Sequence, residues 1–219
     1  MAWLRSPMYR WNSLYDRVLS TLHGEGYEDR FRSIVDALPR DAWILDVGCG
    51  TCHLANVLPS SMGYTGIDLN EHFLSAARER GLDARSHDVL DVASYPSGPT
   101  AIVVSDMLHH VVPHQGEFLA NLGRHLRADL LICETITTGA NPLQRVAGLL
   151  LDNDGINDFR ARLRFHLFEE FTRETLTAQV LAAIPAPEPE ITFWANPGRS
   201  RRGIQFFTLI AHFRAAAGS

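Results

Sequence analysis

One short segment of the sequence has the residue types and spacing of a reactive site, Cys49-x-x-Cys52-His53. The whole segment has the spacing of a c-type haem attachment motif, and its Cys-x-x-Cys part is also typical of thioredoxin-like or zinc-binding pairs. Cys133, the remaining cysteine, lies far along the chain and offers no second pair for a four-sulfur zinc site. The surrounding sequence must therefore indicate which of these chemistries, if any, the segment performs.

Composition and charge exclude several classes of activity. All 20 basic residues are arginine, so a mechanism that needs a Schiff-base lysine or a P-loop lysine is excluded. The formal net charge of −5 provides no general attraction to nucleic acid or to an anionic membrane. A chain of 219 residues, 46% of them hydrophobic, has enough apolar material for one well-packed domain.

The cytoplasm is the location that the sequence predicts. The first residues, MAWLRSPMYR, lack the apolar run of a secretory signal, and no later apolar stretch is long enough for membrane insertion. Structural disulfides belong to oxidising compartments, and covalent haem attachment normally belongs to exported proteins. This location argues against the haem interpretation, so we expect Cys49 and Cys52 to be structural and no metal to be bound.

Short apolar runs alternate with helical periodicity along most of the chain. Helices alternating with strands indicate βαβ units, and hence a doubly wound, mostly parallel α/β sheet with helices on both faces. The last two strands flank a turn-rich segment and predict a C-terminal antiparallel hairpin. We predict one domain over 1–219, with a helical lid at 1–40 and a helical insertion at 135–188 that forms a wall on the substrate side. The seven predicted strands lie at 42–47, 63–68, 83–88, 100–106, 128–135, 190–195 and 204–213.

The cysteine segment directly follows the first buried strand and opens the next helix. In a doubly wound sheet this turn lies at the carboxyl ends of the strands, where nucleotide-like cofactors bind. Gly48 and Gly50 let the backbone turn tightly and approach a ligand closely. Asp68 ends the second strand about twenty residues further on, where a carboxylate can accept hydrogen bonds from both hydroxyls of a ribose.

Two classes of cofactor share this geometry. A dinucleotide site has the pattern G-x-G-x-x-G, but the third glycine position here holds His53. Asp46 precedes the first glycine by two residues, and a carboxylate is unfavourable beside a pyrophosphate. The same carboxylate suits a cofactor that carries an ammonium group, such as S-adenosylmethionine.

Four segments resemble the motifs of the class I S-adenosylmethionine-dependent methyltransferases, of the small single-domain kind. They are LDVGCGT (45–51), GIDLN (66–70), HDVLD (87–91) and SDMLHHV (105–111). The resemblance implies a seven-stranded Rossmann-like fold, S-adenosylmethionine as cofactor, and adenine recognition by Asp88 and the Val89 amide. The cofactor-binding residues that it implies are Asp46, Gly48, Cys49, Gly50, Asp68, Leu69, Asp88, Val89, Ser105 and Asp106.

Cys52 departs from the family pattern, which more often has glycine here, as in GCGTG. A side chain at this position faces the first turn of the following helix in our interpretation. We therefore expect a local change in packing with cofactor binding retained.

Methyl transfer needs a nucleophile aligned with an activated methyl group, water excluded and, for a nucleophile that carries a proton, a base. His109 and His110 lie just past the fourth strand, at the ligand-binding edge, and are the leading candidate bases. The alternative is that they only shape the pocket or cap the next helix. Glu134, at the end of the fifth strand, is a weaker candidate, and Asp106 is expected to bond either the cofactor or the substrate.

Substrate choice is expected to reside outside the motifs. Tyr9, Trp11 and Tyr15 are predicted to form an aromatic lid over the acceptor, or else a helix docked on the sheet edge. Glu134 and Arg160 are further candidates for substrate binding, with a solvated helix face as the alternative for the arginine. The DNDG segment at 152–155 resembles the start of an EF-hand, but apolar residues occupy later ligand positions, so it is interpreted as a turn.

Three functions therefore remain open. The first is methyl transfer to an O, N or C nucleophile of a small molecule such as a natural product, quinone or lipid-like acceptor. The second is methylation of nucleic acid or protein, which the acidic charge disfavours. The third is a non-catalytic S-adenosylmethionine-binding protein, or an NAD-dependent oxidoreductase with a similar motif.

Overall fold

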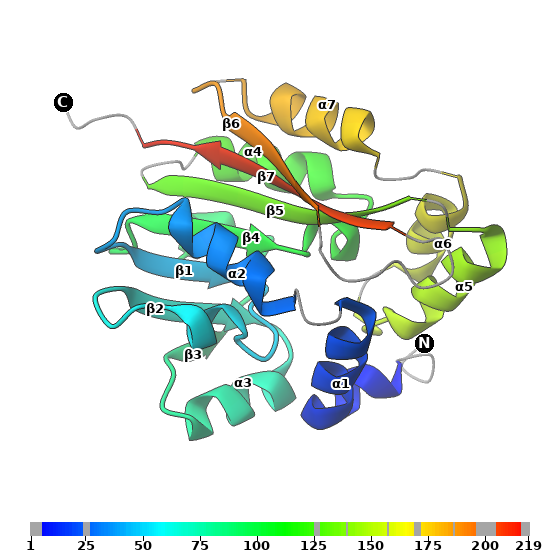
Figure 1. The fold of residues 1–219 in the computed structure, drawn as a ribbon, viewed down its shortest axis with the longest axis horizontal. Coiled ribbons are helices and arrows are strands. Elements are labelled where there is room, and N and C mark those ends of the chain that lie inside the picture. The colour runs from blue at the N-terminus through cyan, green and yellow to red at the C-terminus, as the bar shows by residue number, and fades with distance from the viewer. Residues whose placement is uncertain are drawn as a thin grey trace.

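The structure is a computed structural model that describes residues 6–23, 27–124, 128–138, 140–156, 158–168, 172–185, 187–195 and 205–215. Its strands form one seven-stranded sheet in the order β3-β2-β1-β4-β5-β7-β6 (Figure 1). The strands from β3 to β5 in this order pair in parallel, and β7 pairs antiparallel with both β5 and β6. This is the doubly wound sheet with a C-terminal antiparallel pair that the sequence predicts. The strands are β1 Trp43–Val47, β2 Gly63–Asp68, β3 Ala84–Ser86, β4 Ala101–Ser105, β5 Asp129–Thr138, β6 Glu190–Ala195 and β7 Gln205–Phe213.

Helices cover both faces of the sheet. Figure 1 shows α2 on one face and α4 with α7 on the other, while α5 and α6 lie beyond one end of the strands. The α-helices are α1 Asn12–His23, α2 Tyr27–Asp36, α3 Glu71–Glu79, α4 Gln115–Arg124, α5 Pro142–Leu151, α6 Phe159–Phe168 and α7 Arg173–Ala183. Short 3-10 helices are η2 Pro7–Arg10, η4 Leu54–Val57, η5 Val92–Ser94 and η6 Leu108–His110. No helix among the described residues is both long enough and apolar enough to pass through a bilayer.

The two faces of the sheet carry separate hydrophobic cores. Successive side chains of a strand point to opposite faces, so neighbouring residues of one strand join different cores. On β4, Val104 packs with α4 and α7, whereas Val103 packs with α2. On β5, Ile132 and Leu131 divide in the same way. Because the central strands are buried on both faces, they have the near-continuous apolar sequences that made them recognisable.

The helix after β2 begins and ends at the residues that local chemistry favours. The Asn70 side chain accepts a hydrogen bond from the His72 amide and caps the N-terminus of α3. Gly81 has φ +81°, the left-handed conformation that glycine adopts without strain, and it follows the last turn. The local chemistry of Asn70 and Gly81 thus accounts for the limits of this helix.

Segment 135–188 does not form a single substrate-side wall. Its first residues, through Thr138, continue β5, because β7 pairs with them as far as Gln205. At its end, Leu176 and Val180 of α7 belong to the same core cluster as Phe118 of α4, so α7 covers the sheet. The part that borders the ligand-binding end is therefore α5 with α6.

Candidate active site

A cavity of about 880 Å³ lies at the carboxyl ends of the parallel strands, bordered by the N-terminal segment and by α5 and α6. This is the edge where ligands of doubly wound sheets bind. The residues that the methyltransferase resemblance implied for the cofactor all line this one cavity, from four separate segments of the chain. They are Asp46, Gly48, Cys49, Gly50, Asp68, Leu69, Asp88, Val89, Ser105 and Asp106.

The loop after β1 is shaped by glycines in the left-handed region. Gly48 has φ +71°, and a Cβ built on it would lie 2.4 Å from Met107 Sδ. Gly50 has φ +52°, and its amide donates a 2.9 Å hydrogen bond to Asp68 Oδ2. Because other residues adopt these angles only at a cost, the turn that opens the cavity depends on glycine. The predicted functional role of both glycines is thus consistent with the local geometry.

Cys52 also has a positive φ, +60°, and is fully buried against Leu74 and Ala77 of α3. This contact is with α3, whereas the first turn of the following helix was expected, and the element that follows is only the 3-10 helix η4, so the segment does not open an α-helix. Cys49 and Cys52 are both free and buried. A hydrogen bond with Cys52, together with burial, raises the pKa of Cys49 well above its usual value. A neutral, buried thiol is a poor nucleophile, which agrees with a structural role for Cys49.

Asp46 lies buried under the glycine loop. Its Oδ2 accepts a 2.8 Å hydrogen bond from the Tyr64 hydroxyl. Burial raises the pKa of Asp46 to about 7, with a further contribution from the negative charge of Asp68, while the Tyr64 hydrogen bond opposes the shift. A cationic ligand group next to Asp46 would favour the ionised carboxylate.

The other two acidic residues of the cofactor motifs are held by backbone amides. Asp68 accepts hydrogen bonds from the Gly50 amide at 2.9 Å and the Asn70 amide at 2.7 Å, one on each oxygen. Asp88 Oδ1 accepts from the Leu90 amide at 2.9 Å. Each carboxylate oxygen has a second lone pair, so both residues keep acceptor capacity toward the cavity.

Ser105 and Asp106 end β4 at the floor of the cavity. Ser105 Oγ is buried and has no hydrogen-bond partner among the described residues. Asp106 forms an ion pair with Arg30 of α2 and accepts hydrogen bonds from the amide and hydroxyl of Thr135. The Arg30 guanidinium also lies 4.7 Å from the centre of the Phe31 ring. Asp106 is therefore committed mainly to holding a buried arginine that itself lines the cavity.

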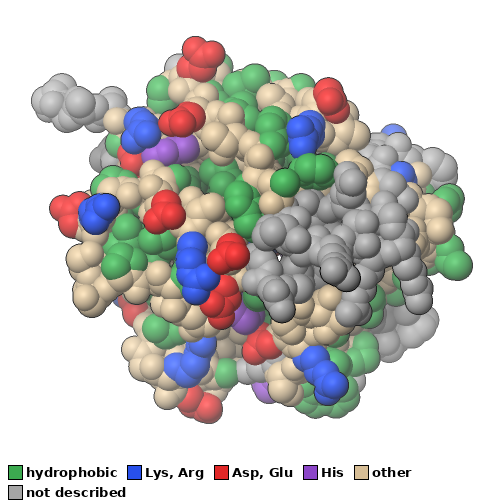
Figure 2. All heavy atoms as spheres, in the orientation of Figure 1, with side chains coloured by type: hydrophobic (Ala, Val, Ile, Leu, Met, Phe, Trp, Pro, Cys, Tyr) green, Lys and Arg blue, Asp and Glu red, His purple; other side chains and the backbone are tan. Residues whose placement is uncertain are grey.

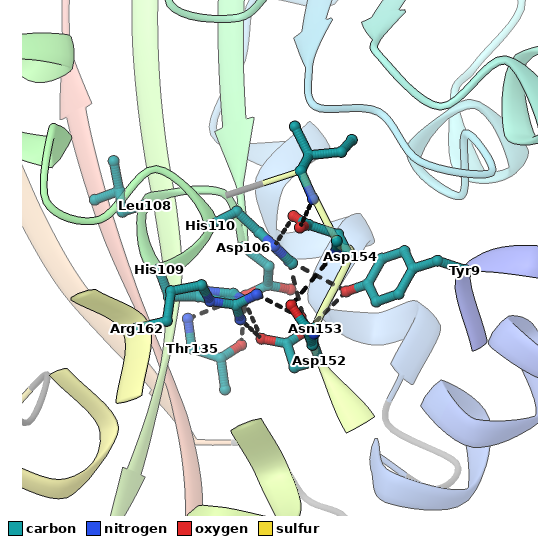
Figure 3. A network of polar contacts seen from close by, with 12 residues as sticks. Tyr9, Asp106, Leu108, His109, His110, Thr135, Asp152, Asn153, Asp154 and Arg162 are labelled. Atoms are coloured by element: carbon teal, nitrogen blue, oxygen red, sulfur yellow. Dashed lines mark hydrogen bonds and ion pairs between the residues drawn. The ribbon is translucent and has the colours of Figure 1, made fainter. Parts of the chain in front are cut away.

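The two histidines of the fourth motif lie on the other side of the cavity and point toward Asp152, as Figure 3 shows. His109 Nδ1 contacts the buried Glu134 carboxylate, and its Nε2 lies 3.2 Å from Asp152 Oδ2. Burial alone would lower the pKa of His109, but the charges of Glu134 and Asp152 outweigh it and raise that pKa well above the usual value. The two carboxylates therefore favour the protonated form of His109.

His110 has a different environment. Its Nδ1 lies 3.0 Å from Asp154 Oδ2, and its Nε2 lies 3.4 Å from the Tyr9 hydroxyl and 3.5 Å from Asp152 Oδ1. The Tyr9 hydroxyl donates to Asp152 Oδ1 at 2.8 Å (Figure 3). The fully buried Arg162 of α6 donates to the Asp152 carboxylate and to its backbone carbonyl, both at 2.6 Å. Asp152 is thus the centre of this polar cluster.

The predicted substrate-side residues divide into two groups. Tyr9 and Tyr15 line the cavity, with ring centroids 5.8 Å apart. Trp11 does not line it and is 57% exposed, and Glu134 lies behind His109 without reaching the cavity surface. Arg160 is exposed and does not line the cavity. Residues two apart on a helix face different directions, and here Arg162 is the arginine that points inward. We therefore withdraw Trp11 and Arg160 from the site.

Four residues of the site were not predicted. Arg30 follows Tyr27 and precedes Phe31 and Ile34 on the apolar face of α2, and a charge on such a face was a usable signal. Asp152 and Asp154 belong to the DNDG segment, which the sequence predicts as a turn. That interpretation did not indicate that the two carboxylates point into the cavity. Nothing local distinguished Arg162 from its neighbours, since its burial depends on the packing of α6.

Comparisons with known proteins agree with this geometry. A family model described as a methyltransferase domain matches residues 44–129. Trans-aconitate 2-methyltransferase of Mycolicibacterium gilvum is 34% identical over 121 residues, which cover 54% of this chain and 46% of that protein. The chain thus spans less than half the length of the curated relatives that it matches.

Solved structures share the fold over nearly the whole chain. A methyltransferase from Thermotoga maritima, described as a possible histamine N-methyltransferase, aligns with a TM-score of 0.62 at 15% identity and covers 94% of this chain and 98% of its own. A TehB-like methyltransferase from Corynebacterium glutamicum aligns with a TM-score of 0.57 at 16% identity and covers 94% and 97%. The family model thus matches a methyltransferase domain over less than half of the chain, and these solved structures show that the chain shares their fold.

Proposed function

We propose that the protein binds S-adenosylmethionine and transfers its methyl group to a small molecule. The proposal is carried by one observation: residues from four motifs line a single cavity, with two histidines on its other side. A cavity of about 880 Å³ lies toward the upper end of the range for small-molecule sites, which is consistent with a cofactor and an acceptor bound together.

The described residues of the cofactor half fit S-adenosylmethionine. Asp46 would hold its ammonium group, Asp68 its ribose hydroxyls and Asp88 its adenine edge. Arg30 is a cation at the cavity surface and would hold its carboxylate, and the unpartnered Ser105 hydroxyl offers a further hydrogen bond. When bound, the cofactor supplies a methyl group on a positively charged sulfur, which is an activated electrophile.

The remaining tasks fall to the chain itself. Aromatic side chains of the N-terminal segment contact α3 and exclude water on that side, with Tyr15 and Phe73 ring centroids 4.8 Å apart. Asp154 fixes His110 through Nδ1, so Nε2 is the atom placed to take up a proton from the acceptor. His109 contacts the buried Glu134 carboxylate through Nδ1, and its Nε2 lies 3.2 Å from Asp152, closer than the 3.5 Å of His110 Nε2, so we assign the base role to His110.

The acceptor side favours an uncharged or cationic small molecule. Asp152 and Asp154 line this part of the cavity, with Glu134 directly behind. These carboxylates would repel a polyanion such as trans-aconitate, so we do not carry over the substrate of the curated relatives. A hydroxyl-bearing natural product or quinol fits this environment.

The alternatives have less support. Arginine and acidic side chains are mixed over the face seen in Figure 2, and the described residues on that face form no basic patch that would attract nucleic acid. A dinucleotide pyrophosphate would lie beside Asp46, where charge repulsion opposes it. The cytoplasmic location remains a prediction from the sequence.

Ligand-dependent stability tests the cofactor assignment. We expect S-adenosylmethionine and S-adenosylhomocysteine to raise the melting temperature in a saturable way, and NAD to leave it unchanged, because a ligand that binds only the native state stabilises it by mass action. Asp68→Ala should weaken the effect at least roughly ten-fold, since two ribose hydroxyls lose a charged acceptor. Stabilisation by NAD without stabilisation by S-adenosylmethionine would refute the proposal.

A pair of histidine variants tests the base. His110→Asn keeps a donor near the position of Nδ1 and removes Nε2, so turnover with an acceptor found by screening should fall about 10²- to 10⁴-fold. Affinity for S-adenosylmethionine should be unchanged. His72→Gln, at an exposed position of α3, is the matched control and should match wild type. If the turnover of His110→Asn stays within a factor of a few of wild type, His110 is not the base, and the reaction depends on the positioning of the acceptor alone.

A further inference from the structure

The histidines at the acceptor side share an arrangement that base catalysis does not require. Each ring has its Nδ1 against a separate carboxylate, Glu134 for His109 and Asp154 for His110. Each ring therefore turns its Nε2 to the same third carboxylate, Asp152, at 3.2 Å and 3.5 Å (Figure 3). One nitrogen of each ring is thus fixed from behind, and the other two nitrogens converge.

This is the pattern found around protein-bound metal ions. A metal-ligating histidine almost always gives its other ring N–H to a carboxylate or carbonyl, which fixes the ring and its tautomer. One ring nitrogen of each histidine and one Asp152 oxygen all lie within 4.8 Å of one another. Bonds of about 2.0–2.1 Å at tetrahedral angles would place ligand atoms about 3.3 Å apart. This is close to the 3.2 Å from His109 Nε2 to Asp152 Oδ2 and to the 3.5 Å from His110 Nε2 to the other oxygen, Oδ1.

Asp152 is prepared for the same role. Arg162 holds its Oδ2 from the side of α6, and the Tyr9 hydroxyl donates to its Oδ1. A ligating carboxylate is commonly oriented by such hydrogen bonds. Glu134, Asp152 and Asp154 carry three negative charges against the one positive charge of Arg162, so a divalent cation would balance the group with both imidazoles neutral.

We propose that His109, His110 and Asp152 bind a divalent transition-metal ion of the zinc, cobalt or iron type. Two imidazoles and one carboxylate suit these metals better than magnesium or calcium, which prefer oxygen ligands. All three residues line the cavity, so the remaining coordination positions face the acceptor. The site departs from the sequence expectation that no metal is bound.

The effect of this ion on the acceptor rests on the proposed function. A hydroxyl oxygen at an open position would lose its proton more readily, because the cation stabilises the oxyanion. In the loaded protein His110 is then a ligand, and the proton leaves to solvent instead of to Nε2. The site thus favours acceptors with a hydroxyl that can coordinate a metal.

Metal binding is testable without the acceptor or the cofactor. Chelator-treated full-length protein is titrated with Co²⁺, followed by visible absorption and by calorimetry. We expect one equivalent to bind, with the intense bands of a low-symmetry, four- or five-coordinate site. Asp152→Asn and His109→Gln should abolish this spectrum, and Glu134→Gln should weaken affinity roughly 10- to 100-fold through loss of orientation.

The cysteine pair supplies the matched control. Cys49→Ser with Cys52→Ser removes the other motif of the chain that resembles a metal site, and it should leave the Co²⁺ spectrum and stoichiometry unchanged. Thiolate-to-cobalt charge transfer, or loss of binding in this double variant, would overturn the proposal. If Asp152→Asn does not fold, electron-nuclear double resonance of wild-type protein loaded with Cu²⁺ still tests the site. The proposal requires two coordinated imidazoles in that spectrum.

The outcomes also separate this proposal from the proposed function. Stabilisation by S-adenosylmethionine without Co²⁺ binding refutes the metal site and leaves His110 as the base. One equivalent of Co²⁺ at the three residues supports the site even if S-adenosylmethionine does not bind, and in that case only its role in methyl transfer is lost.

Discussion

Asp46→Asn is expected to make the protein more stable above neutral pH while weakening its hold on the cofactor. In the native state burial raises the pKa of Asp46 to about 7, whereas an exposed aspartate in the unfolded chain has its ordinary value near 3.8. The native protein therefore keeps a proton that the unfolded chain has already lost. From about pH 4 upward this difference lowers the free energy of unfolding. The decrease is complete once the pH has passed the native pKa.

The magnitude follows from the two pKa values. One pKa unit corresponds to about 1.4 kcal/mol, so the difference lowers the free energy of unfolding by roughly 4 kcal/mol across this range, and relaxation of the site reduces it to about 2–4 kcal/mol. Asparagine has no charge to bury and can still accept the Tyr64 hydrogen bond. The variant should therefore lack this part of the pH dependence and exceed wild type in stability at about pH 8 by a similar amount.

Urea unfolding at several pH values measures the stability of Asp46→Asn and wild type. Calorimetric titration with S-adenosylmethionine measures their affinity for the cofactor. Wild-type affinity should fall as the pH drops below about 7, because the carboxylate must then be deprotonated to meet the ammonium group. Asp46→Asn should bind at least roughly ten-fold more weakly, with little pH dependence. If the variant unfolds with the wild-type pH profile and also binds with wild-type affinity, both the burial argument and the assigned role are wrong.

Three further changes test the loop and the polar cluster. Gly48→Ala places a Cβ against Met107 at φ +71°, so we expect a loss of about 1–3 kcal/mol in denaturant unfolding and weaker cofactor binding; unchanged stability would contradict the assigned backbone strain. Cys52→Gly relieves a positive φ but removes a buried thiol, and the two effects oppose each other. Stability should therefore stay within about 1 kcal/mol of wild type, and cofactor affinity within about two-fold. Loss of activity would indicate a chemical role for the sulfur. Arg162→Met leaves Asp152 without its buried partner and should cost about 3 kcal/mol, less when combined with Asp152→Asn; additive losses would show that the pair does not act as a unit.

The cofactor half of the site was predictable because its parts are local. Each motif is a strand end followed by a turn, so a few adjacent residues specify both the chemistry and the backbone that presents it. Gly48 and Asp68 lie at the ends of neighbouring parallel strands, and the sheet brings their motifs to one edge by construction. The same regularity allowed the strands to be located from apolar runs alone.

The acceptor half depends on contacts between residues far apart in the sequence. The Tyr9 hydroxyl meets Asp152 across 143 positions, and His110 meets Asp154 across 44. The sequence by itself determined the sheet, the cofactor loop and the two histidines at the ligand-binding edge. Only the tertiary structure decided that a turn after α5 would bring two carboxylates to those histidines and that Arg162, not Arg160, would be buried. The physical reason is that periodicity reports which face of an element is apolar, whereas the partner of a buried charge depends on how separate elements pack.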